Sequence, residues 1–152
     1  MPHAIQMHRT DGCKHTILYT KQDFVAEVSR ISGGEKLPVA FDSVGKDTFL
    51  PSLDCLRPRG LMVTFGQASG PIDPIAPVLL SQKGSLFLTR PILFHYIQRR
   101  DALEASAKEL FEVVASGKVR INVNQRFALK DAAEAHKALE ARATSGSTIL
   151  TT

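Results

Sequence analysis

The first half of the chain alternates between two patterns of hydrophobic positions, one typical of buried strands and the other of amphipathic helices. Short runs of adjacent apolar residues that end at turn residues predict strands, whereas apolar residues repeated every three or four positions predict helices. Strands that alternate with helices of about ten residues indicate βαβ units, so the predicted fold class is α/β with a parallel sheet. The predicted elements are a strand at 15–19, a helix at 21–31, a strand at 37–41, a helix at 47–56, a strand at 61–65, one helical turn near 76–80 and a strand at 84–89.

The second half of the chain has a different character. Polar residues separate the apolar ones in its first predicted strand, which is typical of a strand with one exposed face. Such a strand suits the edge of a sheet or a second sheet. The predicted elements are a helix at 94–116, a strand at 119–127, a helix at 130–143 and a strand at 147–152.

The composition is that of an ordinary soluble domain with a hydrophobic core. Of the 152 residues, 43% are hydrophobic and 22% are charged. No apolar run is long enough to span a membrane, and the N-terminus lacks the apolar centre of a signal peptide, so we expect a cytoplasmic location. The formal charge of +4 comes from 19 basic and 15 acidic residues that never form a basic block. We therefore expect neither a nucleic-acid partner nor a membrane partner.

The cysteines and histidines form no recognised disulfide or metal pattern. Cys13 and Cys55 lie far apart and outside any C-x-x-C pair, and with no secretion signal both are expected to be free thiols. Cys55 falls in an apolar helical stripe, where a core position is favoured over a reactive one. The five histidines show neither H-E-x-x-H nor another known ligand spacing, so no metal site is predicted.

Three predicted strands end in small polar turn residues, and a ligand site is best placed there. The turns are Tyr19-Thr20, the run 42–45 and the run 65–67. In open α/β sheets, ligands bind outside the carboxyl ends of the strands, so neighbouring parallel strands would bring these turns to one edge. A nucleotide there would meet backbone N–H groups, an aromatic ring and residues small enough to allow close approach. The alternative is that each is a turn without a ligand.

Sequence signatures of a dinucleotide site or of a catalytic nucleophile are absent. Pyrophosphate binding by this fold needs a G-x-G-x-x-G turn between the first strand and its helix, and the chain has none. No G-x-S-x-G sequence positions a nucleophilic serine. Asp42 could act as an acid or base at a strand end, but anchoring its own turn is the favoured role. The catalytic residues are therefore unknown.

One ordered set of motifs resembles a known family. The sequence contains, in this order, VAFDSVG, SLDCLRPRGLMVTFGQASG, GSLFLTRP and RATSGSTIL. From about Gly12 to its last residue, the chain is similar to the C-terminal half of NADPH-dependent quinone oxidoreductases, the ζ-crystallin-like branch of the medium-chain dehydrogenase/reductase superfamily. Members have a GroES-like catalytic domain, with a Rossmann domain inserted before its last segment. The resemblance therefore implies an irregular N-terminal tail at 1–12, a partial Rossmann-like cofactor-binding domain at 13–117 and a terminal catalytic-domain segment at 118–152.

The resemblance also implies an activity and a set of site residues. Members of this branch transfer a hydride from NADPH to quinones or related electron-poor enones without zinc, so the expected cofactor is NADPH and the expected substrate is a quinone-type small molecule. Family dimers pair a strand across a two-fold axis, and the matching strand runs from Gly84 to Thr89, which implies a homodimer. The residues that match cofactor contacts are Tyr19 near the adenosine end, Ser43, Val44 and Gly45 beside the nicotinamide ribose, Phe65, Gly66 and Gln67 at the nicotinamide half, Thr89, Arg90 and Pro91 at the next strand end, and Arg142 near the C-terminus.

Several parts of the family's fold have no counterpart in this sequence. They are the Gly-rich turn, the first two Rossmann strands, the basic residue that reads the 2′-phosphate, and most of the catalytic domain. One hypothesis is an NADPH:quinone oxidoreductase, or a fragment of one, in which this chain carries the nicotinamide-side wall and the dimer strand. The other is a non-catalytic dimerisation module that cannot hold a dinucleotide tightly. Both leave an unpaired apolar edge near 39–41, so we expect a dimer or a larger assembly.

Overall fold

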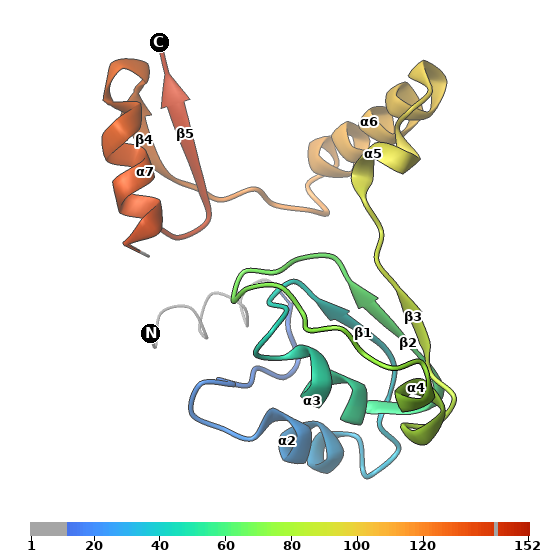
Figure 1. Ribbon diagram of the computed structural model, residues 1–152. Helices are drawn as coiled ribbons and strands as arrows, with labels where there is room; N and C mark the ends of the chain where they lie inside the picture. Colours follow the sequence, from blue (N-terminus) through green and yellow to red (C-terminus); the bar gives the residue numbers. More distant parts are fainter. Residues whose placement is uncertain (1–11, 142) are drawn as a thin grey trace. The chain divides into compact units, whose positions relative to one another are not determined.

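The computed structural model describes residues 12–141 and 143–152, which divide into two compact units. The first unit ends at His95 and the second begins at Tyr96, and each has its own sheet (Figure 1). Among the described residues, no helix is both long and apolar enough to cross a membrane.

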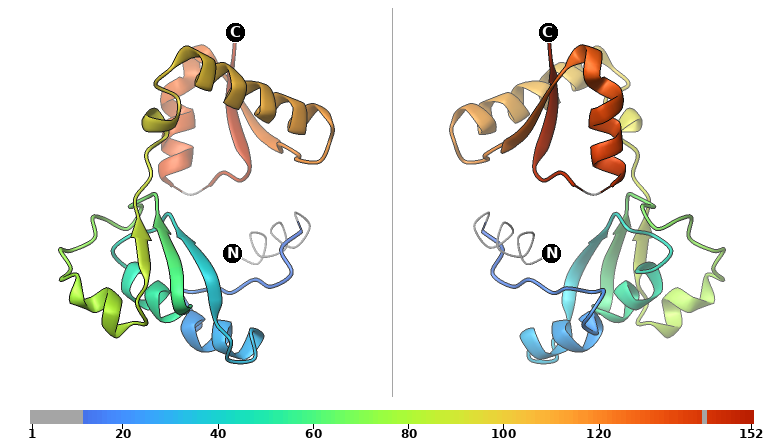
Figure 2. Two further views of the ribbon diagram at one scale, coloured as in Figure 1. Left: turned by 90° about the vertical axis from the view of Figure 1, so that its right-hand side faces the viewer. Right: turned by 90° about the vertical axis from the view of Figure 1, so that its left-hand side faces the viewer.

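The first unit is built around a parallel three-stranded sheet, which confirms the predicted α/β class. Its elements are α2 (Phe24–Ile31), β1 (Leu37–Asp42), α3 (Phe49–Asp54), β2 (Leu56–Thr64), α4 (Val78–Gln82) and β3 (Phe87–Thr89). The strands lie side by side in the order β1-β2-β3, and α3 packs against β1 and β2 (Figure 2). Val39 is aligned with Leu61 and Leu61 with Phe87, so the carboxyl ends of all three strands reach one edge. The consecutive residues Met62 and Val63 are both buried, which confirms that β2 is covered on both faces.

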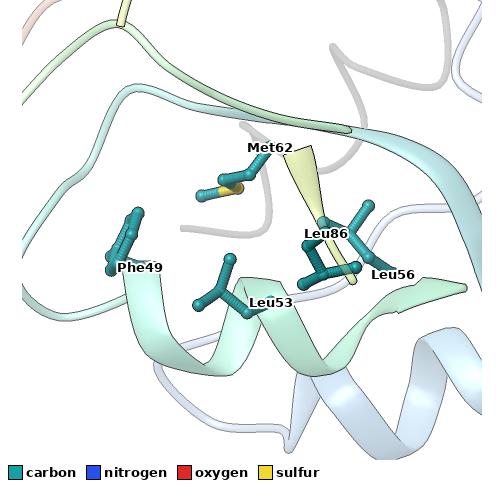
Figure 3. Close-up of a cluster of buried hydrophobic side chains, with 5 residues drawn as sticks. All are labelled: Phe49, Leu53, Leu56, Met62 and Leu86. Atoms are coloured by element: carbon teal, nitrogen blue, oxygen red, sulfur yellow. The ribbon is translucent and has the colours of Figure 1, made fainter. Parts of the chain in front are cut away.

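Five buried side chains form the core between α3 and the sheet (Figure 3). Phe49 and Leu53 lie about one turn apart on α3, and both are buried in the same cluster as Met62 of β2. Leu53 and Met62 are fully buried, and burying a side chain of this size contributes about 1.5–3 kcal/mol to folding. Leu56 and Leu86 complete the cluster.

The first turns of α2 and α3 contain residues that suit a helix N-terminus. The Asp23 carboxylate accepts hydrogen bonds from the N–H groups of Val25 and Ala26 at 2.9 and 3.1 Å, which caps α2. Pro51 is the third residue of α3, where its missing N–H has no intrahelical acceptor to lose. A proline is tolerated at this place, in the first turn of a helix.

The strand predicted at 15–19 is wrong, because this segment leads into a turn. The Leu18 N–H donates to Oε1 of Gln22 at 2.9 Å, and the Leu18 carbonyl accepts from the N–H groups of Lys21 and Gln22 at 2.8 and 3.0 Å. These bonds occupy the backbone groups that a strand offers to its neighbour. An apolar run forms a strand only where a neighbouring strand pairs with it, and none of the described strands pairs with this segment.

The boundaries of β2 and β3 also differ from the predicted ones. The strand predicted at 61–65 follows a run of turn-type residues at 57–60, whereas β2 begins at Leu56 and runs through that segment. Arg59 adopts a φ of +60° there, and its N–H donates to the Gly84 carbonyl at 2.8 Å. The turn signals therefore mark an irregularity inside a strand and not its beginning. The predicted strand at 84–89 is reduced to the three residues of β3.

The second unit contains a separate two-stranded parallel sheet, which is one of the two arrangements that the pattern of this half indicates. Its elements are α6 (Arg100–Ala115), β4 (Val123–Ala128), the 3₁₀ helix η1 (Leu129–Asp131), α7 (Ala132–Glu140) and β5 (Ser147–Thr151). The helix α7 packs against β4 and buries Ala135. The predicted assignment of residues 118–152 to a catalytic domain concerns a larger protein and stays a prediction.

Two predictions in this half are corrected. The long helix predicted at 94–116 is divided into α5 (Leu93–Tyr96) and α6. Arg99 breaks it with an extended backbone, φ −91° and ψ 142°, and its guanidinium pairs with Asp101 at 2.9 Å. The strand predicted at 119–127 begins only at Val123, where pairing with β5 starts. Strand pairing thus decides where this strand begins, and alternation of apolar residues does not.

Both edges of the three-stranded sheet expose apolar side chains. Within the described residues, no strand pairs with the outer edge of β1, as predicted, and Phe41 there is 73% exposed. On β3, Phe87 and Leu88 are also exposed. An unpaired edge with apolar side chains is a template for pairing with another chain.

We expect this chain to associate in solution, and Phe41→Lys to weaken that association, because a lysine on an edge strand opposes strand pairing. Size-exclusion chromatography with light scattering at high protein concentration measures both. The matched control is Leu50→Lys, which places the same charge at an exposed position on α3. A monomeric unmodified chain at high concentration contradicts the expectation.

Candidate functional site

The turn after β1 is organised by the buried carboxylate of Asp42. Its Oδ1 accepts hydrogen bonds from the N–H groups of Val44 at 2.7 Å and Gly45 at 3.0 Å. Its Oδ2 accepts from the hydroxyl groups of Thr48 at 2.8 Å and Ser52 at 3.5 Å. Both carboxylate oxygens are thus used within the protein, which agrees with the favoured role of Asp42 as a turn anchor.

The turn after β2 lies directly against the turn after β1. The Phe65 N–H donates to the Asp42 carbonyl at 2.9 Å, and the Ala68 N–H donates to the Ser43 carbonyl at 3.3 Å. A Cβ atom on Gly66 would lie 2.3 Å from the Ser43 carbonyl oxygen, closer than real Cβ atoms approach. Only glycine allows the two turns to meet in this way.

A second set of contacts also holds these two turns together. The Ser69 N–H and Oγ both donate to the Val44 carbonyl, at 2.8 and 2.9 Å, and Oγ also accepts from the Asp47 N–H at 3.0 Å. Gly45 has a φ of +91°, and a Cβ atom on it would lie 2.9 Å from Cα of Gln67. Hydrogen bonds and close packing therefore hold the backbone of this edge at several points.

The guanidinium of Arg90 joins the end of β3 to the end of β2. It donates to Oγ1 of Thr64 at 3.3 Å, to the Gly66 carbonyl at 3.2 Å and to Oε1 of Gln67 at 3.4 Å. Arg90 directly follows Thr89, the last residue of β3. All three strand ends are thus linked, and the exposed guanidinium of Arg90 places a positive charge at this edge.

A groove lies beside the end of β1. It has a volume of about 280 Å³, and Tyr19 and Phe41 are its most exposed aromatic residues, 47% and 73% exposed. It is lined by Ile17, Tyr19, Phe24, Phe41, Asp42, Ser43, Val44, Thr48 and Ser52. The groove therefore combines aromatic surface with the polar turn that follows β1.

The structure brings most of the predicted site residues together. The turns 42–45 and 65–67 meet, and Arg90 lies against the second of them. Tyr19 shares the groove with the first turn, although it does not end a strand. Arg142 lies outside the described residues. The individual cofactor contacts of these residues stay predictions.

Two residues of this site were missed in the sequence analysis. Ser69 makes hydrogen bonds to Val44 within the first turn and to Asp47 just after it, and its only sequence signal was its place among small residues after a buried strand. Phe41 lines the groove, but an apolar residue near the end of an apparently buried strand suggests a core position. Neither role follows from local sequence, because each depends on a neighbouring segment.

The described residues offer little covalent or metal chemistry. They contain no group of three or more histidine, cysteine, aspartate or glutamate side chains placed to hold a metal ion. Cys55 is buried, and burial, helped by the nearby Asp54 carboxylate, raises the pKa of its thiol to about 11. The thiol is therefore neutral near pH 7 and a poor nucleophile. The joined strand ends suit binding and orientation of a polar ligand.

Known proteins resemble this chain along nearly its whole length. The family model described as zinc-binding dehydrogenase matches residues 12–150. A quinone oxidoreductase of Pseudomonas aeruginosa is 48% identical over 149 residues, which are 98% of this chain and 46% of that protein. A 2-haloacrylate reductase of a Burkholderia species is 48% identical over 140 residues, which are 91% of this chain and 42% of that protein.

A solved structure agrees with these sequence matches. The crystal structure of Escherichia coli quinone oxidoreductase complexed with NADPH aligns with a TM-score of 0.93 and 44% identity, covering 100% of this chain and 47% of that one. The chain thus spans about half the length of the curated relatives it matches. The resemblance to quinone oxidoreductases is confirmed, and the chain belongs to the zinc-binding dehydrogenase family.

Proposed function

We propose that this chain forms part of an NADPH-dependent oxidoreductase that reduces quinones or related electron-poor enones. The observation that carries the proposal is the linked edge of the sheet, where three strand ends meet in a chain 48% identical to a quinone oxidoreductase. Ligands of open α/β sheets bind outside such strand ends. A relative of similar fold is the quinone oxidoreductase complexed with NADPH.

The residues of this edge fit the nicotinamide half of NADPH. Ser43 and Gln67 are exposed and offer polar side chains, and Phe65 offers an exposed aromatic ring. The guanidinium of Arg90 supplies a positive charge near a ligand that carries negative phosphates. The bound cofactor would supply the hydride, while these residues hold and orient its nicotinamide end. The groove at Tyr19 is the proposed place for the adenosine end.

The substrate class is part of the proposal. One relative is a quinone oxidoreductase and another is a 2-haloacrylate reductase, and both names describe acceptors with a conjugated, electron-poor double bond. Such a bond accepts a hydride at carbon, and its carbonyl or carboxylate oxygen then carries the developing negative charge. Donors at the sheet edge are suited to that oxygen.

Zinc has no assigned part in this proposal, although the family description names it. The described residues do not provide a fitting set of metal ligands, and no step of the proposed reaction passes through a metal ion. Transfer without zinc is what the resemblance to this branch implies. The cytoplasmic location expected from the sequence belongs to the same proposal.

A homodimer is also proposed, paired through the strand from Gly84 to Thr89. Phe87 and Leu88 are exposed there, which supports pairing with a second chain. The light-scattering measurement described for Phe41→Lys distinguishes the two edges. Leu88→Lys should weaken association if the chains pair through β3, and Phe41→Lys if they pair through β1.

The alternative function is a non-catalytic dimerisation module. It is favoured by the lack of a G-x-G-x-x-G turn in the sequence, because that turn normally holds the pyrophosphate. Under this alternative the chain keeps the fold and the exposed edges but does not bind the dinucleotide.

Titration of the purified chain with NADPH, followed by cofactor fluorescence, distinguishes the two functions. We expect saturable binding at or below millimolar cofactor. Ser43→Phe should abolish it by filling the edge, whereas Ser106→Phe, on the exposed side of α6, should leave it unchanged. Absence of saturable binding up to millimolar NADPH would overturn the proposal for this chain and favour the dimerisation module.

A further inference from the structure

We propose that Arg90 is a positioning residue that fixes the amide of Gln67, so that this amide presents its N–H donors to a carbonyl oxygen of the ligand. The hydrogen bonds that hold Arg90 and Gln67 lie within the protein and involve no ligand. The identity of the ligand rests on the proposed function. Within that function, the carbonyl belongs either to the carboxamide of the nicotinamide ring or to the quinone.

The orientation of the Gln67 amide follows from what a guanidinium can do. Arginine has N–H donors and no acceptor, so a glutamine that faces it must turn its oxygen toward it. The structure has this arrangement, with Nη2 of Arg90 donating to Oε1 of Gln67 at 3.4 Å. The NH₂ group of the amide is then directed away from Arg90. Glutamine oxygen and nitrogen are otherwise hard to distinguish, and here the chemistry distinguishes them.

The guanidinium is itself held in place. Its Nη1 donates to the Gly66 carbonyl at 3.2 Å and to Oγ1 of the buried Thr64 at 3.3 Å. Three acceptor atoms at the end of β2 thus accept hydrogen bonds from two nitrogen atoms of the planar guanidinium group. A lysine, which offers a single ammonium at the end of a flexible stem, cannot reproduce this geometry.

The backbone of Gln67 is also held in place by its neighbours. Its carbonyl accepts the Gly70 N–H at 2.9 Å, and its Cα lies so close to Gly45 that a Cβ atom there would be 2.9 Å away. The Gln67 side chain is therefore fixed at its Cα atom by the backbone and at its Oε1 atom by Arg90. In the described part of the chain, its NH₂ group has no hydrogen-bond partner, and the residue is exposed. The donors are free for a ligand oxygen.

This assignment changes the role that the family resemblance implies for Arg90. The resemblance lists it with the residues that contact the cofactor, whereas its bonds in the structure go to the neighbouring turn. A direct contact with a cofactor phosphate is the competing role. The two roles predict different effects of replacing Arg90 on ligand affinity. A positioning role should affect only ligands that contain nicotinamide, whereas a phosphate contact should affect every ligand that carries the phosphates.

The first test compares ligands. Gln67→Glu keeps an oxygen facing Arg90 but replaces the outward NH₂ donor with an acceptor. We expect its dissociation constant for NADPH to rise about threefold to tenfold, the range for one lost hydrogen bond, with no change for 2′,5′-ADP, which lacks nicotinamide. If only the affinity for a water-soluble naphthoquinone sulfonate falls, the carbonyl is that of the quinone. Gln82→Glu, on the exposed surface of α4, is the matched control.

The second test measures the geometry without any ligand. In the ¹⁵N-labelled chain, the side-chain NH₂ signals of Gln67 should shift in Arg90→Met and, less strongly, in Arg90→Lys, while those of Gln82 stay unchanged. Backbone signals of β2 report whether the variants keep their fold. Failure of the proposed function leaves this result intact, since it needs no NADPH. Unchanged Gln67 signals in both Arg90 variants, or equal loss of NADPH and 2′,5′-ADP binding in them, would overturn the inference.

Discussion

Replacing Gly66 with alanine is expected to lower the free energy of unfolding of the first unit by about 3 kcal/mol or more. The added Cβ would lie 2.3 Å from the carbonyl oxygen of Ser43 and 2.8 Å from its Cα. Both are backbone atoms, so no side-chain rotation relieves the overlap, and the two turns must separate. Urea denaturation followed by circular dichroism measures the loss.

Separation of the turns should also be visible at the proposed site. The bonds from Phe65 to Asp42 and from Ala68 to Ser43 would lengthen or break, so NADPH binding should fall even where the fold persists. Gly34→Ala is the control, because Gly34 has a φ of +87° and nothing within 4 Å of an added Cβ. It should cost only the strain of a left-handed residue, about 1–2 kcal/mol. An effect of Gly66→Ala no larger than this would contradict the steric argument.

The sheet of the first unit was predictable because its signals are local and mutually consistent. The buried run that contains Met62 and Val63 has the composition of a strand covered on both faces, and Phe49 and Leu53 recur at helical spacing. Burial of these residues needs only that the strand and the helix pack together, which the sequence pattern already implies. The parallel arrangement then follows from the helices between strands.

Two of the errors occur where strand pairing decides the structure. The segment 15–19 has an apolar run like that of a strand, but it has no partner among the described strands and leads into a turn. The strand predicted from position 119 starts only at Val123, where β5 becomes available. Local pattern shows that a segment can be a strand, whereas the neighbouring segment decides whether its hydrogen bonds are made.

The candidate site was predictable in its place but not in its contacts. Turn residues after strands indicate an edge where ligands bind, and the turns 42–45 and 65–67 do meet there. The bridges from Ser69 and Arg90 join residues more than 20 positions apart in the sequence. No local pattern reports such pairs, so these roles required the structure.

Replacing Asp42 with alanine is expected to destabilise the first unit by about 3 kcal/mol, because a buried acceptor is removed from several donors at once. The N–H groups of Val44 and Gly45 and the hydroxyl of Thr48 would lose the buried carboxylate that accepts their hydrogen bonds. The turn that carries Ser43 would then lose its anchor, so NADPH binding should fall together with stability. Urea denaturation and the cofactor titration measure the two effects.

The variant Asp42→Asn separates hydrogen bonding from the loss of side-chain volume. Its Oδ1 can still accept the two N–H groups, and its NH₂ can donate to Oγ1 of Thr48, since a hydroxyl accepts as well as donates. The expected loss is therefore smaller, about 1 kcal/mol. Asp73→Ala, at an exposed carboxylate of the same unit, should stay within about 0.5 kcal/mol of the unmodified chain. Equal losses in Asp42→Asn and Asp42→Ala would show that the carboxylate charge, and not the set of acceptors, holds this turn.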